Sequence, residues 1–311
     1  MQTSTNKPTF TMLVGLPGSG KSTYAAEQHE KYGVHVCSSD AIRKELAGDE
    51  NSQENNEDVF KLLHKRVKEY LKNGESVIYD ATNVKSKRRR AFLKELKYIP
   101  CEKVCIIFRT PYDICVANQT NRDRKVPEEV IRGMYMKWDT PYWFEGWDNI
   151  YIKNGYDINS YQERLVKTPR DFIYTYAYYS QDNEHHRLGL GDHCLYTAKL
   201  VDGGLVLRNA AAIHDCGKPF SKTYVNMKGE LTANAHYYGH DHIGAYEALF
   251  YEYPGVHELD VSILVNLHMM PYGWGKDKIN GIKTSEKYRK IWGDQLYGMV
   301  LRLHEADKMA H

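Results

Sequence analysis

The residues from Gly15 to Ser22, GLPGSGKS, constrain the fold of this chain more than any other stretch. They fit the phosphate-loop pattern G-x-x-x-x-G-K-[ST], in which glycines let the backbone curve and point several N–H groups into one cavity. An apolar run at 10–14 predicts a buried strand before the loop, and residues 23–32 predict a helix after it. This order of strand, loop and helix predicts an α/β domain with a parallel sheet flanked by helices.

The same loop predicts a nucleotide site. Lys21 would reach the β- and γ-phosphates of a bound ATP or other NTP, and the hydroxyl of Ser22 would ligate Mg²⁺. The residues that we expect to bind the nucleotide are Gly15, Pro17, Gly18, Ser19, Gly20, Lys21, Ser22 and Thr23.

Asp40 and Arg43 follow the next predicted strand, at 34–38. Ligands of parallel α/β sheets bind at the carboxyl ends of the strands, and a carboxylate there can take the proton of an attacking hydroxyl. Arg43 lies one helical turn later on the same face and is suited to hold a phosphate. The pattern alone leaves open that Asp40 only caps a helix.

Two basic segments lie further along the first half. Residues 85–90 carry Lys85, Lys87, Arg88, Arg89 and Arg90, which predict a solvated helix face or, alternatively, a contact with a polynucleotide backbone. Arg122 and Arg124 precede Val126-Pro127. A mobile arginine there could stabilise the charge on a transferring phosphoryl group and contact the nucleotide, although two arginines in a loop are commonly plain surface.

Together these pieces resemble the phage-type polynucleotide 5′-kinase domain over roughly residues 10–150. The resemblance implies that Asp40 is the general base for a 5′-OH, that Arg43 contacts the acceptor phosphate, and that Arg122 clamps the γ-phosphate. The segment Asp80–Asn83 matches the Asp-x-Thr-Asn segment that this group often carries. The chain departs from the family in the lid, where Asn118-Gln119 stands in place of an Arg-Asn pair.

Histidine divides the chain unevenly, with 3 of the 14 histidines in residues 1–150 and 11 in residues 151–311. This shift places a boundary in the stretch 151–168, so we expect one domain at 1–155 and a second at 156–311.

The second half carries histidines and aspartates on predicted apolar helices. A His-Asp pair such as His214-Asp215 is costly to bury unless it binds something. Imidazole and carboxylate together suit Mn, Fe, Ni, Co or Zn, and two such ions can activate a water in phosphoester cleavage. One histidine alone would more often be a hydrogen-bonded core residue. His236 and His240 are spaced as one helical turn. The candidates are His193, His214, Asp215, His236, His240, His268 and Asp307.

The order His193, His214-Asp215, Asp307 resembles the HD phosphohydrolase superfamily, an all-α metal-dependent fold, over roughly residues 170–311. The resemblance implies that the candidates above are ligands of one or two divalent metals and that Lys218 holds the scissile phosphate. Some relatives place an arginine one turn after the last aspartate, where this chain has His311.

These two modules predict a bifunctional enzyme that heals nucleic-acid ends. The first would phosphorylate 5′-OH ends of RNA or DNA, and the second would remove 3′ or 2′,3′-cyclic phosphates. The chain has no K-x-D-G motif, so a separate RNA ligase would seal the ends. The alternative is a small-molecule P-loop kinase fused to an HD nucleotidase.

The rest of the sequence argues against a membrane protein, a secreted protein and a strongly basic nucleic-acid-binding protein. No apolar run approaches the roughly 18 residues of a membrane span, and Met1–Pro8 lacks the apolar core of a signal peptide. The six cysteines form no C-x-x-C pair, and the net charge is only +2. We therefore expect a cytoplasmic protein that has reduced thiols and no membrane partner. The oligomeric state is left open.

Overall fold

The computed structural model describes residues 7–47, 56–120, 125–157, 167–182, 187–274 and 278–310. The chain forms two compact units, one from Met1–Met134 with Pro141–Tyr161 and the other from Tyr135–Thr140 with Gln162–His311. Among the described helices, none has both the length and the hydrophobicity that crossing a bilayer requires.

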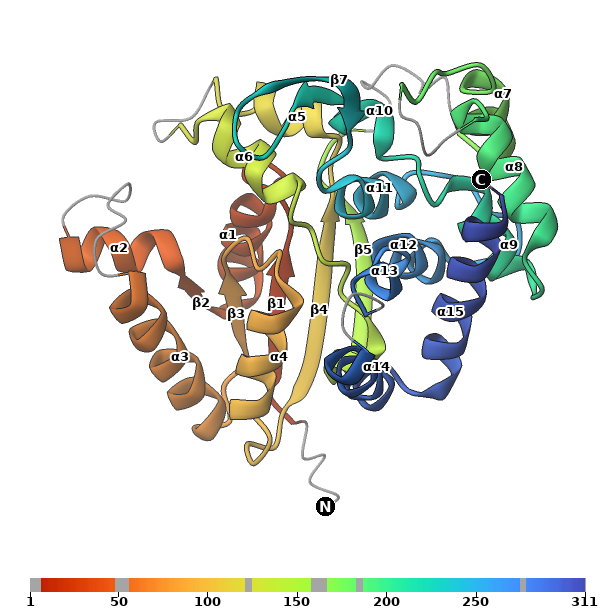
Figure 1. Ribbon diagram of the computed structural model, residues 1–311. Coiled ribbons are helices and arrows are strands. Elements are labelled where there is room, and N and C mark those ends of the chain that lie inside the picture. Colours follow the sequence, from red (N-terminus) through yellow and green to blue (C-terminus); the bar gives the residue numbers. More distant parts are fainter. Residues whose placement is uncertain are drawn as a thin grey trace. The chain divides into compact units, whose positions relative to one another are not determined.

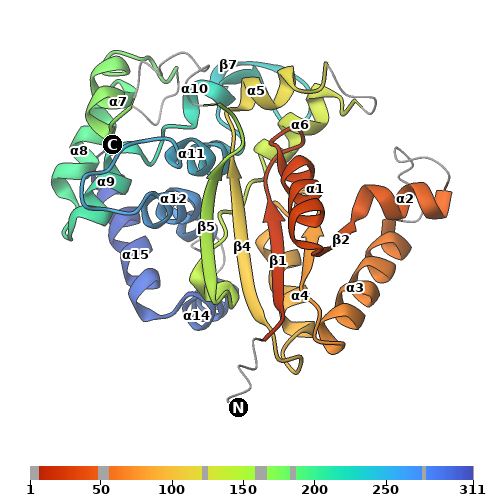
Figure 2. The same cartoon turned by 180° about the vertical axis from the view of Figure 1, so that it is seen from behind.

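The first unit is built on a five-stranded parallel sheet in the order β2-β3-β1-β4-β5. Its central strands are buried along most of their length, as expected when helices cover both faces. Figures 1 and 2 show α1 and α4 on opposite faces of this sheet. The strands are β1 (Thr9–Val14), β2 (His35–Ser38), β3 (Val77–Asp80), β4 (Glu102–Arg109) and β5 (Asn149–Asn154).

The helices of the first unit follow from apolar spacing and from glycine at their ends. Buried Val59, Leu63, Val67 and Leu71 form one stripe of α3. Helix α1 begins directly after Gly20 and ends at Gly33, both in the left-handed conformation. The helices are α1 (Lys21–Tyr32), α2 (Ser39–Ala47), α3 (Asn56–Lys72), α4 (Ser86–Glu95), α5 (Tyr112–Ala117), α6 (Glu128–Tyr135) and the 3₁₀ turn η1 (Trp143–Glu145).

The second unit is largely helical. Its departure from the all-α expectation is the antiparallel pair β6 (Thr223–Val225) and β7 (Leu231–His236). The short segment Tyr135–Thr140 belongs to this unit, where Trp138 is fully buried and the hydroxyl of Thr140 bonds that of Ser262 at 2.7 Å. The helices are α7 (Pro169–Thr175), α8 (Leu190–Leu200), α9 (Leu205–Ile213), α10 (Lys218–Ser221), α11 (His240–Ala248), α12 (Glu258–Leu267), α13 (Met270–Trp274), α14 (Lys278–Trp292) and α15 (Asp294–Met309).

One glycine sets the path of the chain at the centre of the second unit. A Cβ atom on Gly217 would lie 2.0 Å from the carbonyl oxygen of His240 and 2.5 Å from the amide nitrogen of Gly244. Only glycine therefore allows the turn after α9 to pass this closely against α11. The approach brings Asp215, two residues before Gly217, next to the start of α11.

Candidate functional site

The phosphate loop joins β1 to α1 in the first unit. Gly18 and Gly20 have φ angles of 82° and 92°, which favour glycine. The Lys21 ammonium is buried inside the loop, where its Nζ donates to the carbonyl oxygens of Gly15 at 2.9 Å and Leu16 at 2.7 Å. A flexible lysine held this way needs only a change of rotamer to turn toward a phosphate in the loop.

A cavity of about 1570 Å³ in the first unit opens onto this loop. Asp40, Arg43 and Asp80, at the carboxyl ends of β2 and β3, contribute to the same lining. Gly15 does not line the cavity. A Cβ atom there would lie 2.6 Å from the hydroxyl of Ser19, so this glycine has a packing role. The predicted nucleotide-binding residues in the lining are Pro17, Gly18, Ser19, Gly20, Lys21, Ser22 and Thr23.

Asp40 lies in the first turn of α2 with its side chain 42 % exposed. Its carboxylate pairs with the guanidinium of Arg43 at 2.7 Å, and Arg43 in turn donates to Oδ1 of Asn56 at 3.0 Å. The hydroxyl of Ser38 accepts the backbone N–H of Asp40 at 3.3 Å and takes the capping position before the helix. The Asp40 carboxylate therefore lines the cavity. The arginine beside it, Arg43, is held in place by Asn56.

The segment after β3 is held next to the phosphate loop. The amide of Gly15 donates to the carbonyl of Thr82 at 3.1 Å, and the Asn83 side chain donates to the carbonyl of Leu13 at 2.8 Å. Asn83 has a φ of 50°, and its carbonyl accepts from Arg89 at 2.8 Å. The rest of the Arg89 guanidinium is bound to the carboxylate of Glu145 at 2.6 and 2.8 Å, fully buried. For Arg89, the expectation of a solvated helix face was wrong, because its charge is buried against Glu145.

The lid arginines Arg122 and Arg124 lie outside the described residues. The residues that depart from the family pattern are visible. Asn118 donates to the carbonyl of Gly18 at 2.9 Å, and Gln119 accepts the amide of Val126 at 3.2 Å. Asn118 thus connects the end of α5 to the phosphate loop, and Gln119 fixes the backbone at Val126.

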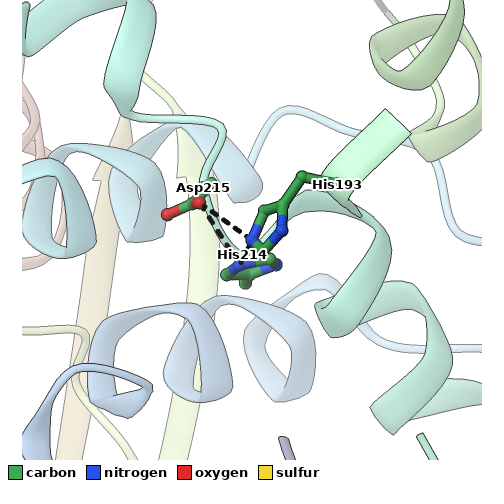
Figure 3. A group of neighbouring side chains, drawn as sticks. All are labelled: His193, His214 and Asp215. Carbon is green, nitrogen blue, oxygen red and sulfur yellow. Dashed lines mark hydrogen bonds and ion pairs between the residues drawn. The ribbon is translucent and has the colours of Figure 1, made fainter. Parts of the chain in front are cut away.

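In the second unit, residues from three helices bring imidazoles and carboxylates together. Nε2 of His193, on α8, lies 3.1 Å from Oδ1 of Asp307 on α15 and 3.5 Å from Oδ2 of Asp215. Nε2 of His214, directly after α9, lies 3.3 Å from each of these two carboxylate oxygens. Figure 3 shows His193 and His214 directed toward Asp215. All four side chains are buried, and three of them form a group able to hold a metal.

A second group shares Asp215 and includes His240 and His268. His240, the first residue of α11, and His268, directly after α12, place Nε2 at 3.3 and 3.7 Å from Oδ1 of Asp215. Within the described residues, neither buried Nε2 has a hydrogen-bond partner.

The opposite ring nitrogens show why these Nε2 atoms suit a metal. Nδ1 of His214, His240 and His268 lies 2.9, 2.7 and 2.7 Å from a backbone carbonyl oxygen. A carbonyl can only accept, so Nδ1 of each ring carries a proton, and a ring that binds a metal presents its Nε2 lone pair on the side of Asp215. Backbone carbonyls fix metal-binding histidines in the same way. The donor set therefore fits one or two divalent metals.

The charges in this pocket are consistent with a bound cation. Burial alone would raise the pKa of Asp215, but Lys218 and His214 hold that pKa well below its usual range. The pKa of Asp307 is likewise lowered, because His214 and His193 outweigh its burial. Burial lowers the pKa of His214, but the carboxylates of Asp215 and Asp307 raise it well above 6.5. A proton therefore competes with a metal for this ring.

The structure does not bring His236 into either group. His236 ends β7, its Nε2 lies 3.0 Å from the hydroxyl of Thr232, and its ring stacks on Tyr238. The expected single helical turn from His236 to His240 was wrong, because Gly239, with a φ of 71°, separates the strand from α11. His311 lies outside the described residues.

Lys218 opens α10 and places Nζ 2.7 Å from Oδ2 of Asp215 and 2.7 Å from Oε1 of Gln181. Gln181 was not found from the sequence, and neither was Tyr272, whose hydroxyl donates to Oδ2 of Asp307 at 2.9 Å. Both residues lie more than 30 positions from their partners. No local pattern could therefore have indicated them.

The comparisons with known proteins match the part of the chain that forms the first unit. A family model described as "AAA domain" matches residues 10–141. The match covers the phosphate loop and most of the first unit, whose parallel sheet with flanking helices has the fold of a P-loop nucleotide-binding domain.

Two curated relatives of this stretch are kinases. The chain is 32 % identical to L-seryl-tRNA(Sec) kinase of Methanococcus maripaludis over 142 residues, which is 44 % of this chain and 55 % of the relative. It is 27 % identical to adenylate kinase of Thermosipho melanesiensis over 143 residues, 46 % of this chain and 56 % of the relative. The chain thus spans about half the length of these relatives. A solved structure of the Pnkp1/Rnl/Hen1 RNA repair complex is similar at a TM-score of 0.37, with 24 % identity, over 43 % of this chain and 44 % of that chain.

Proposed function

We propose that this chain is a bifunctional enzyme that heals broken polynucleotide ends. The first module (residues 1–155) phosphorylates 5′-OH ends with ATP or another NTP and Mg²⁺. The second module (residues 156–311) is an HD-type phosphohydrolase that removes 3′ or 2′,3′-cyclic phosphates. A separate RNA ligase, acting in the same cytoplasmic compartment, would join the healed ends.

The kinase proposal is carried by the presence of Lys21 and Asp40 in the lining of one cavity. The acceptor hydroxyl oxygen attacks the γ-phosphorus, the bond from that phosphorus to the β–γ bridging oxygen breaks, and Asp40 takes the hydroxyl proton. Lys21 stabilises the charge on the transferring group, and Arg122 would close over it from the lid. Arg43, next to Asp40, holds the acceptor phosphate, while Arg124 supports the nucleotide.

A nucleic-acid acceptor is supported by one curated relative, which is named for a kinase of tRNA-linked serine. The name of that protein describes an acceptor, the serine of seryl-tRNA, that is attached to an RNA. The adenylate kinase relative favours the second candidate, a kinase of small nucleotides or metabolites fused to an HD nucleotidase.

The phosphohydrolase proposal is carried by the fixed tautomers of His214, His240 and His268, whose Nε2 atoms converge on Asp215. The residues proposed to hold one or two divalent ions (Mn, Ni, Co, Fe or Zn) are His193, His214, Asp215, His240, His268 and Asp307. Such ions supply a water of lowered pKa and neutralise charge on the cleaved phosphoester. Lys218, beside Asp215, holds the scissile phosphate. Gln181 keeps the Lys218 ammonium in place.

The test is a pair of single substitutions read out on both ends of one oligonucleotide. Lys21→Ala should lower 5′ labelling from γ-labelled ATP by about 10²-fold or more, while 3′ dephosphorylation persists. Asp215→Ala should do the reverse. An intact protein that acts on neither terminus in the presence of ATP and divalent metals would contradict the proposal. Labelling of small alcohols or free nucleotides in preference to the oligonucleotide would favour the second candidate.

A further inference from the structure

The cavity of the first unit extends beyond the groups that carry out the proposed chemistry. Its lining continues along one face of α3 with Asn56, Phe60 and His64, which follow one another at intervals of four residues. Asn56 is bonded to Arg43 at 3.0 Å, and Arg43 is paired with Asp40. This row therefore begins beside the proposed general base and leads away from it on the acceptor side.

Phe60 and His64 form a preorganised aromatic wall. Both are half-buried, and their ring centroids lie 6.4 Å apart. His64 is held from three sides: Nδ1 lies 3.1 Å from Oε1 of Glu95, the Tyr79 hydroxyl lies 3.3 Å from Nε2, and the ring packs on Phe92 at 4.1 Å. A rigid aromatic surface loses little conformational entropy when a planar ring stacks on it.

A cation lines the same cavity at the start of α4. Arg88 is exposed and makes no ion pair within the part of the chain that the structure describes. Its neighbours differ, because Lys87 is exposed but outside the lining and Arg89 is neutralised by Glu145. Lys61, also in the lining, is paired with Glu57 at 3.1 Å. Of the basic run at residues 85–90, Arg88 is thus the exposed member that faces the cavity.

We propose that this wall is the polymer-binding subsite of the kinase, where Phe60 stacks on a nucleobase near the 5′ end and Arg88 contacts a backbone phosphate. The inference rests on the proposed 5′-kinase function and specifies its substrate class as single-stranded polynucleotide. An aromatic face and an uncompensated arginine in the lining of one cavity form the combination that binds single strands with little dependence on base identity. A small alcohol offers neither a π-face nor a phosphodiester.

Phe60→Ala tests the stacking contact. We expect the KM for a 5′-OH oligonucleotide to rise about 10-fold, which corresponds to roughly 1.4 kcal/mol, while the KM for ATP does not change. The effect should disappear on an oligonucleotide whose first two residues lack bases, and Phe60→Tyr should restore binding. The control is Tyr70→Ala, because Tyr70 lies on the same helix, stacks on His35 and is not in the lining.

Arg88→Ala tests the backbone contact. It should lower the slope of log affinity against log salt by about one, and the loss should vanish on an oligonucleotide with uncharged methylphosphonate linkages. Lys87→Ala, one position away and outside the lining, is the matched control.

Binding of a fluorescent single-stranded oligonucleotide, measured by anisotropy, separates this inference from the proposed function. Binding that depends on Phe60 without 5′ phosphorylation would refute the kinase proposal and support the subsite. Equal losses on base-containing and abasic strands, or a raised KM for ATP in Phe60→Ala, would overturn the subsite. Absence of binding by the intact protein would also overturn it.

Discussion

The Nζ atom of Lys218 lies 2.7 Å from Oδ2 of Asp215, and both side chains are at least 95 % buried. Asp215 is also the carboxylate on which the two histidine groups converge. The lysine therefore supplies a positive charge next to the place where a divalent ion would supply another. We therefore expect protein stability to depend on metal binding at this point.

Replacing Lys218 should expose that coupling. In Lys218→Met the Asp215 carboxylate loses its buried lysine partner, which costs about 3–5 kcal/mol of unfolding free energy in the presence of a chelator. Added Mn²⁺ or Ni²⁺ should recover much of this loss, because the ion supplies the missing charge. Urea unfolding with and without metal measures both values. The matched control is Lys222→Met, which removes a partly exposed pair with Asp182 and should cost about 1 kcal/mol or less under either condition. A loss in Lys218→Met that is equal with and without metal would contradict the assignment.

Tyr272 should tune the proposed metal site without being a ligand. Its hydroxyl donates to Oδ2 of Asp307 at 2.9 Å, and partners of this kind typically contribute 10- to 100-fold to metal affinity. We expect Tyr272→Phe to weaken Mn²⁺ binding by about that factor in calorimetric titrations of the full chain. Tyr178→Phe makes the same chemical change on a side chain that is 95 % exposed and should have no effect. Unchanged affinity in Tyr272→Phe would rule out this role.

The ion pair of Arg89 with Glu145 should support the first unit as a whole. Glu145→Gln leaves a buried guanidinium without its counter-charge, so we expect a loss of about 3–5 kcal/mol, measured by chemical unfolding. The double variant Arg89→Met/Glu145→Leu should be far less destabilised, because no charge remains buried. Double-variant instability as severe as that of Glu145→Gln would contradict the claim that the unpaired buried charge causes the loss.

His64 should titrate below its ordinary range. Burial lowers the pKa of His64 from 6.5, while Glu95 raises it and Lys68 lowers it. The unfolded chain therefore binds a proton at this position more readily than the folded one. The stabilisation from the neutral ring is present above about pH 6.5 and is lost as the pH falls through the window below 6.5. Resonances of the His64 ring, followed by NMR between pH 7.5 and 4.5, should give a pKa under 6.5, and Glu95→Gln should lower it further. A pKa at or above 6.5 would contradict the expectation that burial outweighs the effect of Glu95 at this ring.

The sequence predicted the first unit well because its signals are local. Glycine spacing in the phosphate loop, an apolar strand before it and the stripe on α3 are all read within a few residues. The phosphate loop requires a strand and a helix on its two sides, and a parallel sheet brings Asp40 to the edge where the loop lies. These features depend on backbone conformation and on the spacing of apolar residues, and both are determined by residues close together in the sequence.

The sequence was less reliable where a short turn changes the type of structure. The spacing of His236 and His240 fits one helical turn, but Gly239 ends a strand and begins a helix between them. Arg89 lies in a run of basic residues, which predicts a solvated side chain. In the structure it is buried in an ion pair with Glu145, 56 positions later. In the first case a local glycine turn overrides the spacing, and in the second an ion pair between residues far apart in the sequence overrides the pattern.

What the sequence by itself determined is the identity of the donors: the phosphate-loop lysine, the aspartates, and the histidines concentrated in the second half. Only the tertiary structure decided which histidine nitrogens face Asp215, which lysine reaches it, and which arginine of the basic run lines the cavity. The physical reason is that side-chain chemistry is encoded one residue at a time. Convergence of atoms from distant helices depends on how those helices pack, and contacts such as the one between Gly217 and His240 set that packing.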